Sequence, residues 1–355
     1  MNPFWSDKRV LLTGHTGFKG SWLSLWLQKL GAQVAGYALS APAASLFELA
    51  SIGEQMTCIY GDICNMEALQ SAFDRFHPDI VFHLAAQSLV RKSYGQPVET
   101  FDVNVMGTIH LFEAVRRSSS CRVVVNVTSD KCYQNKEWVW GYREDDAMGG
   151  RDPYSSSKAC AELVTSAYRS SFFEASPQRR VAVASARAGN VIGGGDFAPD
   201  RLVPDIMAAF TGGESVQIRN PDAVRPWQHV LEPLSGYLAL AERLWHEPSV
   251  HAQAWNFGPL VDDVRPVLWI VNRLAEYWGE PVSWTVDRGP NPHEARTLAL
   301  DSSKARSLLG WKPRWTLEQA LRATTHWYKA YGRGEPLRDL VIQQIESYEA
   351  LASSS

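Results

Sequence analysis

The sequence lacks the features that mark exported, membrane-spanning or zinc-binding proteins. Its five cysteines are odd in number and form no CxxC pair, so we expect neither a disulfide framework nor a metal site. No run approaches the roughly 18 apolar residues of a transmembrane helix, and the opening segment MNPFWSDKR has no apolar signal region. We therefore expect no membrane association and a location in the reducing cytoplasm.

An excess of charge of one sign is also missing. The chain of 355 residues has 35 basic and 38 acidic side chains and a net charge of -3. This balance does not indicate a patch for nucleic acid or for an anionic lipid surface, and no nucleic-acid partner is expected. The length allows one large α/β domain with a smaller lobe.

Short apolar runs alternate with amphipathic segments of helical length through the first half of the chain. The strand-like runs start at Arg9, Gln33, Met56, Asp79, Arg122 and Arg180, and helical patterns cover Ser21–Leu30, Met66–Phe76 and Val98–Arg117. Repeated strand–helix units with Val- and Ile-rich strands predict an α/β fold, a doubly wound parallel Rossmann sheet with helices on both faces.

The pattern changes after Gly193, where glycine and proline separate shorter segments. Helical patterns cover Leu231–Leu244, Arg265–Trp278 and Leu317–Tyr331. We expect a Rossmann domain over residues 1–190, which also carries the reactive side chains described below. Residues 191–352 are then expected to form mainly a smaller C-terminal α/β lobe that binds the substrate.

A glycine-rich turn joins the first predicted strand to the first predicted helix. In GHTGFKG, Gly14 allows a tight turn, Gly17 allows close approach of a phosphate, and Gly20 allows helix-on-sheet packing. The helix N-terminus adds a positive dipole. This context predicts a dinucleotide site.

Two further positions bear on the dinucleotide. Ser40 stands where an acidic residue for the adenosine ribose is expected after the second strand, and no arginine replaces it, so these residues alone do not choose between NAD and NADP. Asp62 follows the third strand and could bind the adenine amino group, although capping of a helix by Asp62 is an equal alternative.

A tyrosine, a lysine and a serine form the predicted reactive group. Tyr154 and Lys158 are one helical turn apart in YSSSK, so their side chains share a face. The Lys158 ammonium is expected to lower the pKa of the Tyr154 phenol from about 10 and make it a usable base. Ser129 ends the fifth strand, at the sheet edge where ligands bind, and can hold a hydroxyl that is being oxidised.

These residues together resemble the extended short-chain dehydrogenase/reductase family, over nearly the whole chain. The resemblance extends to HLAAQ from His83 and to DVNVMGT. It implies NAD as the cofactor and a homodimer or homotetramer. The cofactor contacts that it implies are at Gly14, Gly17, Phe18, Gly20, Asp62, Ile63, Ala85, Ala86, Asn104, Tyr154 and Lys158.

Asp130 and Lys131 directly follow Ser129 and occupy the position where nucleotide-sugar 4,6-dehydratases of this family place an acid/base pair. The dTDP-glucose branch has Asp-Glu there, whereas VTSDKCY, EWVWGYRE and MGGRDPYSSSK resemble the CDP-glucose branch. The resemblance implies the conversion of CDP-glucose to CDP-4-keto-6-deoxyglucose and water, in deoxysugar synthesis for the lipopolysaccharide O-antigen. The alternative for Asp130 and Lys131 is a solvated ion pair on a loop.

Asn190, Arg225 and Arg296 resemble the side chains that hold the substrate diphosphate in the family, and a guanidinium suits phosphate. A turn asparagine and surface arginines are the plainer interpretations. Two other functions stay open. A nucleotide-sugar 4-epimerase needs Ser129, Tyr154 and Lys158 but no acid/base pair, and a dinucleotide-sensing regulatory protein would lose the reactive residues.

Overall fold

A seven-stranded parallel sheet lies at the centre of the computed structural model, which describes residues 3–174, 180–279, 283–287, 289 and 297–351. The strand order is β11-β6-β5-β4-β1-β2-β3. Their bounds are Arg9–Thr13 (β1), Gln33–Ala38 (β2), Thr57–Tyr60 (β3), Ile80–His83 (β4), Val123–Val127 (β5), Ala182–Arg187 (β6) and Ala254–Asn256 (β11). The predicted doubly wound Rossmann fold is confirmed.

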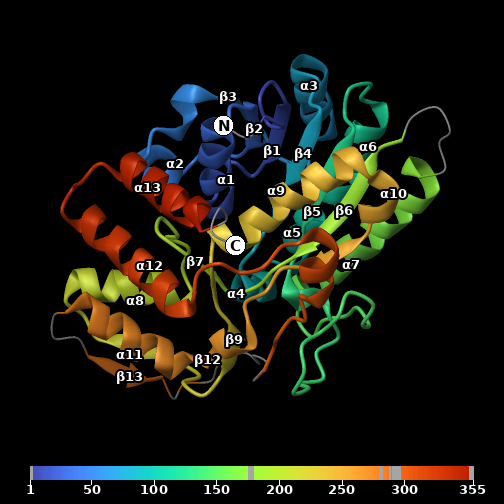
Figure 1. Ribbon diagram of the computed structural model, residues 1–355. Coiled ribbons are helices and arrows are strands. Elements are labelled where there is room, and N and C mark those ends of the chain that lie inside the picture. Colours follow the sequence, from blue (N-terminus) through green and yellow to red (C-terminus); the bar gives the residue numbers. More distant parts are fainter. Residues whose placement is uncertain (1–2, 175–179, 280–282, 288, 290–296, 352–355) are drawn as a thin grey trace.

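Side chains alternate between two cores because successive residues of a strand point to opposite faces of the sheet. In β5, Val123 and Val125 join the larger core, and Val124 joins the smaller one. The helices α1 (Phe18–Lys29) and α9 (Leu231–His246) bring apolar side chains to the larger core. The helices α3 (Met66–Phe76) and α6 (Gly107–Arg117) cover the other face (Figure 1).

The predicted helices match the structure closely except in one place. The helix α3 has the predicted bounds, and the Asn65 side chain caps it by accepting a hydrogen bond from the Ala68 amide. The segment predicted as one helix from Val98 is divided into α5 (Pro97–Phe101), the single π-helical turn η2 (Asp102–Met106) and α6. In η2, the side chain of Asn104 makes tertiary hydrogen bonds that periodicity could not reveal.

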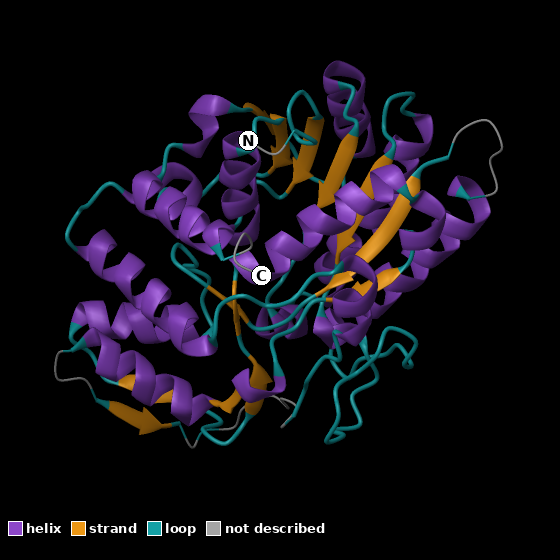
Figure 2. Ribbon diagram, in the orientation of Figure 1, coloured by secondary structure: helices purple, strands orange, loops and turns teal. Residues whose placement is uncertain are grey.

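Beside the sheet, the described residues of the second part of the chain form a lobe that includes three helices and three pairs of short strands; Figure 2 shows its helices and strands apart from the central sheet. The helices are α8 (Leu202–Gly212), α11 (Val267–Trp278) and α12 (Leu317–Gly332). The pairs are β7 (Val191–Ile192) with β10 (Gln228–His229), β8 (Val216–Ile218) with β13 (Trp284–Val286), and β9 (Val224–Pro226) with β12 (Val264–Pro266). Among the described residues, no helix combines the length and apolarity needed to cross a bilayer.

Residues beyond 190 also complete the Rossmann part. The strand β11 pairs with β6, and α9 packs against β5 and β6. The helix α13 (Leu337–Ala350) returns to α1, where Glu349 accepts hydrogen bonds from Trp26 Nε1 and Lys29 Nζ, each at 2.7 Å. The boundary at residue 190 stays a prediction.

The remaining helical segments of the described chain are α2 (Leu46–Leu49), η1 (Ile52–Gln55), α4 (Val90–Gly95), η3 (Asp130–Cys132), α7 (Pro153–Tyr168), η4 (Arg169–Phe173), α10 (Pro248–His251), η5 (Val261–Asp263) and η6 (Ala305–Leu309). Of these, α7 is the longest and carries Tyr154 and Lys158.

Candidate active site

A large cavity opens at the carboxyl edge of the sheet. Strands β1 and β4 are neighbours there, and the strand order reverses between them, which is the usual ligand position in such sheets. The cavity has a volume of about 1500 Å³ and is lined by the glycine loop, the end of β5, the start of α7 and segments of the second lobe. One space therefore brings together the predicted dinucleotide site and the predicted reactive group.

The glycine loop has the geometry of a phosphate cradle. At Gly14, where φ is 77°, an added Cβ would lie 2.8 Å from the Ala85 amide nitrogen, and at Gly20 it would lie 2.1 Å from the Gly14 carbonyl oxygen. At Gly17 an added Cβ would make only an ordinary van der Waals contact, 3.4 Å from the Gly14 carbonyl oxygen, so nothing in the protein itself requires glycine there. Helix α1 starts at Phe18, with no side chain of the described residues capping its amides. These groups fit a pyrophosphate.

Most of the other predicted cofactor residues line the cavity, and Asn104 does not. Asp62, Ile63, Ala85 and Ala86 line the cavity. The Asp62 side chain accepts a hydrogen bond from the Cys64 amide at 2.9 Å, and Asn65 rather than Asp62 caps the following helix.

Asn104 does not line the cavity and is buried behind it. Its side chain accepts a hydrogen bond from the Gln87 amide at 2.9 Å and donates to Gln87 O at 3.0 Å and Ser157 Oγ at 2.9 Å. Asn104 thus ties the loop after β4 to α7.

Tyr154 and Lys158 both lie on the cavity wall and are buried. Burial raises the pKa of Tyr154 to about 12, although Ser129 and Arg201 oppose the increase. Burial also lowers the pKa of Lys158 to about 8. The expected depression of the Tyr154 pKa by Lys158 is therefore wrong for the protein alone, because loss of water around the phenolate outweighs the cations nearby.

Asp130 is fully buried beside Ser129 and Lys131. Its Oδ1 accepts a hydrogen bond from Ser129 Oγ at 3.1 Å and lies 3.5 Å from Lys131 Nζ. A Cβ at Gly189 would lie only 1.8 Å from Asp130 Oδ2, so the glycine makes room for the carboxyl group. Because Asp130 is out of solvent, the alternative of a solvated ion pair does not fit.

A buried ion pair holds α7 against the sheet. Glu162, one turn beyond Lys158, lies 2.7 Å from Arg187 of β6 and accepts hydrogen bonds from Thr128 and Ser185. Burial alone would raise the pKa of Glu162, but Arg187 and these hydroxyl groups hold it below its usual value. The network fixes the helix that presents Tyr154 and Lys158.

Two of the predicted diphosphate residues lie on the cavity wall. Asn190 has a φ of 47°, unusual for a residue other than glycine, and its buried Oδ1 lacks a hydrogen-bond partner among the described residues. Arg225 lies on β9 and donates from Nη1 to the Val224 carbonyl at 2.9 Å. Arg296 lies outside the described residues.

Lys19 and Arg201 are among the cations of the cavity wall that sequence reasoning missed. Arg201 binds Asp196 at 2.9 Å and donates to Ser88 Oγ at 2.8 Å, which joins the two parts of the chain. Burial and, to a smaller extent, the nearby Arg201 charge lower the pKa of Lys19 to about 7. Lys19 could have been noticed within GHTGFKG, but no spacing pattern marks Arg201.

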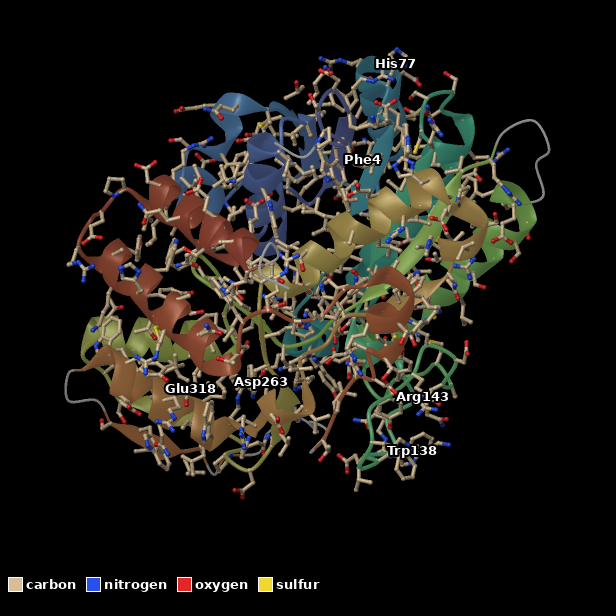
Figure 3. All side chains as sticks on the ribbon, viewed as in Figure 1. Phe4, His77, Trp138, Arg143, Asp263 and Glu318 are labelled. Atoms are coloured by element: carbon tan, nitrogen blue, oxygen red, sulfur yellow. The ribbon has the colours of Figure 1, made fainter. Side chains whose placement is uncertain are left out.

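The loop between η3 and α7 leads away from the sheet to Trp138 and Arg143 (Figure 3). Trp138 stacks on Tyr142 with ring centroids 5.5 Å apart and does not line the cavity. Within the part of the chain that the structure describes, no group of three or more His, Cys, Asp or Glu side chains could hold a metal ion.

Comparison with known proteins agrees with this geometry. A family model described as GDP-mannose 4,6 dehydratase matches residues 11–324. The chain belongs to this family. It is 54% identical to the CDP-glucose 4,6-dehydratase of Salmonella typhimurium over 97% of both chains, and it is therefore a homologue of a hydro-lyase.

Solved structures of other nucleotide-sugar enzymes share the fold. The dTDP-glucose 4,6-dehydratase of Bacillus anthracis in complex with NAD has a TM-score of 0.77 and 22% identity, covering 93% of this chain and 100% of that one. The UDP-glucose-4-epimerase of Stenotrophomonas maltophila, with bound NAD and formylated UDP-arabinopyranose, has a TM-score of 0.80 and 23% identity, covering 92% and 99%. This chain thus has the same fold as a solved 4,6-dehydratase and a solved 4-epimerase, so the fold alone does not distinguish the two reactions.

Proposed function

We propose that this protein is an NAD-dependent CDP-glucose 4,6-dehydratase, which converts CDP-glucose to CDP-4-keto-6-deoxyglucose and water. The observation that carries the proposal is the Asp130–Lys131 pair, placed beside Ser129 in the cavity that Tyr154 and Lys158 also line. An epimerase has no use for a buried carboxyl group at this point. The 54% identity to the Salmonella typhimurium dehydratase supports the same substrate.

The residues present fit NAD. We assign the pyrophosphate to the loop of Gly14, Gly17, Phe18 and Gly20, the adenine side to Asp62 and Ile63, and the nicotinamide side to Ala85, Ala86, Tyr154 and Lys158. Asn104 is assigned no contact with NAD and instead fixes the loop after β4 through its hydrogen bonds with Gln87. When bound, NAD accepts the hydride from C4 of the sugar and returns it to C6.

In the oxidation half of the reaction, Ser129 holds the C4 hydroxyl and Tyr154 accepts its proton. The Ser129 hydroxyl and the Arg201 guanidinium lower the Tyr154 pKa against the effect of burial. We assign Lys158, one turn along α7, to hold the phenolate once the substrate and NAD are bound. The product of this half is a ketone at C4, which acidifies the hydrogen at C5.

In the elimination half, Asp130 gives a proton to the departing C6 hydroxyl while the C5 proton is removed. Lys131 Nζ lies 3.5 Å from Asp130 Oδ1 and 30% of its side chain is exposed. Lys131 either takes the C5 proton or adjusts the charge on Asp130. Lys131→Met separates these roles, because it should stall elimination in the first case and only slow turnover in the second. Loss of the C5 proton and of water leaves a double bond between C5 and C6, which the returned hydride and a proton reduce.

The second lobe is proposed to hold the nucleoside diphosphate, with the boundary between the two units near residue 190. Asn190, Arg225 and Arg296 are assigned to the diphosphate. The unpaired Asn190 Oδ1 is an acceptor that can bind a hydroxyl of the substrate, whereas the guanidinium of Arg225 supplies positive charge at the cavity wall.

We also propose a homodimer or a dimer of dimers, in the cytoplasm. Large apolar side chains are exposed on α5, η2 and α7, namely Val98 at 73%, Phe101 at 37%, Met106 at 42% and Leu163 at 61%, and these elements pack together. Such a face supports an interface. All five cysteines are free thiols, which a reducing compartment maintains. Leu163→Glu should give a smaller species by light scattering.

The test is incubation of the purified protein and NAD with CDP-, UDP-, dTDP- and GDP-glucose, followed by mass spectrometry. The proposal predicts loss of one water from CDP-glucose in preference to the other three. Formation of a 4-epimer, with no change in mass, would assign the protein to the epimerases. Loss of water from a different nucleotide sugar would keep the reaction and overturn the choice of cytidine.

A further inference from the structure

A buried tyrosine on α9 lies beneath the active site. Tyr237 is fully buried, and its hydroxyl group has no hydrogen-bond partner among the described residues. Buried hydroxyl groups in proteins nearly always have a partner, because leaving one unpaired is unfavourable. A neighbouring acceptor is therefore expected.

Asp130 offers the complementary atom. Its Oδ1 is occupied by Ser129 and Lys131, but its Oδ2 is buried and also lacks a partner among the described residues. A carboxylate oxygen can only accept hydrogen bonds unless it is protonated. The Tyr237 hydroxyl can donate one.

A continuous set of contacts connects the two groups. Asp130 lies three residues after the end of β5, against which α9 packs, and its Oδ2 lies against the backbone of Gly189. Gln228 Nε2 donates to the carbonyl oxygens of Gly189 at 3.3 Å and Phe257 at 2.8 Å, and the Phe257 ring packs on the Tyr237 ring with centroids 5.6 Å apart. After burial, the charge on Asp130 is the next influence that raises the pKa of Tyr237.

We propose that Tyr237 is a positioning residue for Asp130, whose Oδ2 receives a hydrogen bond from the Tyr237 hydroxyl through one bridging water. Gln228 Oε1 is a further buried atom without a partner in the described chain and would also bind such a water. This proposal rests on the proposed function, because it assigns Asp130 as the acid of the elimination. The hydrogen bond favours the carboxylate that remains after the proton has been given away.

Other charged and titratable groups near Asp130 also influence its ionisation, so a test of Tyr237 must leave these groups unchanged. The charged and titratable neighbours are Lys19 on α1, Lys131 and Cys132 on η3, Tyr154 on α7 and Tyr237 on α9. Unlike Lys131 and Tyr154, Tyr237 is assigned no proton transfer in the reaction, so its replacement tests its effect on Asp130.

The experiment compares Tyr237→Phe with wild type in the pH dependence of each half of the reaction. A hydrogen bond to the carboxylate favours its ionised form, so the loss of that bond should move the alkaline limb of elimination up by about 1–2 pH units. Oxidation at C4 should keep its pH profile. Superimposable elimination profiles would overturn the proposal, and so would an equal shift of both halves, which would assign Tyr237 to Tyr154 instead.

Two further measurements keep the proposal testable. Tyr277→Phe removes a hydroxyl group on α11 outside the cavity wall and should leave both profiles unchanged. If Tyr237→Phe does not fold, a crystal structure of the wild type decides: Tyr237 Oη within hydrogen-bond distance of Asp130 Oδ2, or of a water bound to it, supports the proposal, and a hydroxyl bonded elsewhere overturns it. Wild-type enzyme that dehydrates no nucleotide glucose would refute the proposed function, while the crystallographic contact would still test the role of Tyr237.

Discussion

Replacing Gly189 by alanine should separate elimination from oxidation. The three atoms nearest to the added Cβ all belong to the Asp130 carboxyl group, at 1.8, 2.0 and 2.4 Å. Since real Cβ contacts are essentially never below 3.0 Å, the Asp130 carboxyl group and the residue 189 backbone must separate by at least 3.0 - 1.8 = 1.2 Å. A displacement of about 1 Å can cost on the order of 10²-fold in rate, so we expect elimination to slow by about that factor.

Oxidation should continue, because the three atoms nearest to the added Cβ all belong to Asp130 and none belongs to Ser129, Tyr154 or Lys158. The assay mixes enzyme, NAD and CDP-glucose and follows nicotinamide absorbance together with the mass of the sugar. Gly189→Ala should accumulate the 4-keto-glucose form with little deoxy product. Gly332→Ala is the matched control, because no atom lies within 4 Å of its Cβ position. Wild-type elimination in Gly189→Ala, or equal loss of both halves, would refute this reasoning.

Three other variants test neighbouring parts of the account. Tyr154→Phe should lower oxidation by about 10²–10⁴-fold while NAD still binds; near wild-type turnover would remove Tyr154 from its role. Arg225→Ala should weaken CDP binding by about 1.5–3 kcal/mol, measured by calorimetry, without changing NAD binding. Glu162→Gln should leave the buried charge of Arg187 without its carboxylate partner and destabilise the fold by about 3–5 kcal/mol in denaturant unfolding. Because the folded pKa of Glu162 is depressed, its contribution to stability is present above its unfolded pKa of about 4.3 and is lost as the pH falls through the folded value; the Glu162→Gln penalty should therefore shrink in acid.

Local sequence patterns were sufficient to predict most strands of the sheet and most helices. Each strand from β1 to β6 lies within a predicted apolar run, because buried parallel strands need continuous apolar residues. The start of α3 is also determined by the local sequence, because the Asn65 side chain caps the helix. The π-helical turn η2 was not predictable, because it accompanies contacts of Asn104 with Gln87 and Ser157, which are distant in the sequence.

The reactive group was predictable where spacing carries chemistry. Tyr154 and Lys158 are one turn apart on α7, and Asp130 and Lys131 adjoin Ser129, so their closeness follows from the chain itself. Arg201 and Tyr237 come from loops and helices of the second half, and only the fold brings them to Asp130 and Tyr154. The Tyr154 pKa was misjudged for a related reason, because burial depends on tertiary packing.

The most direct test of the central claim uses CDP-glucose that carries deuterium at C4. A 4,6-dehydratase moves that hydrogen within the sugar, so the product should have lost one water and should carry the deuterium at C6, as mass spectrometry and NMR would show. Deuterium that stays at C4 of a product with unchanged mass would contradict the account.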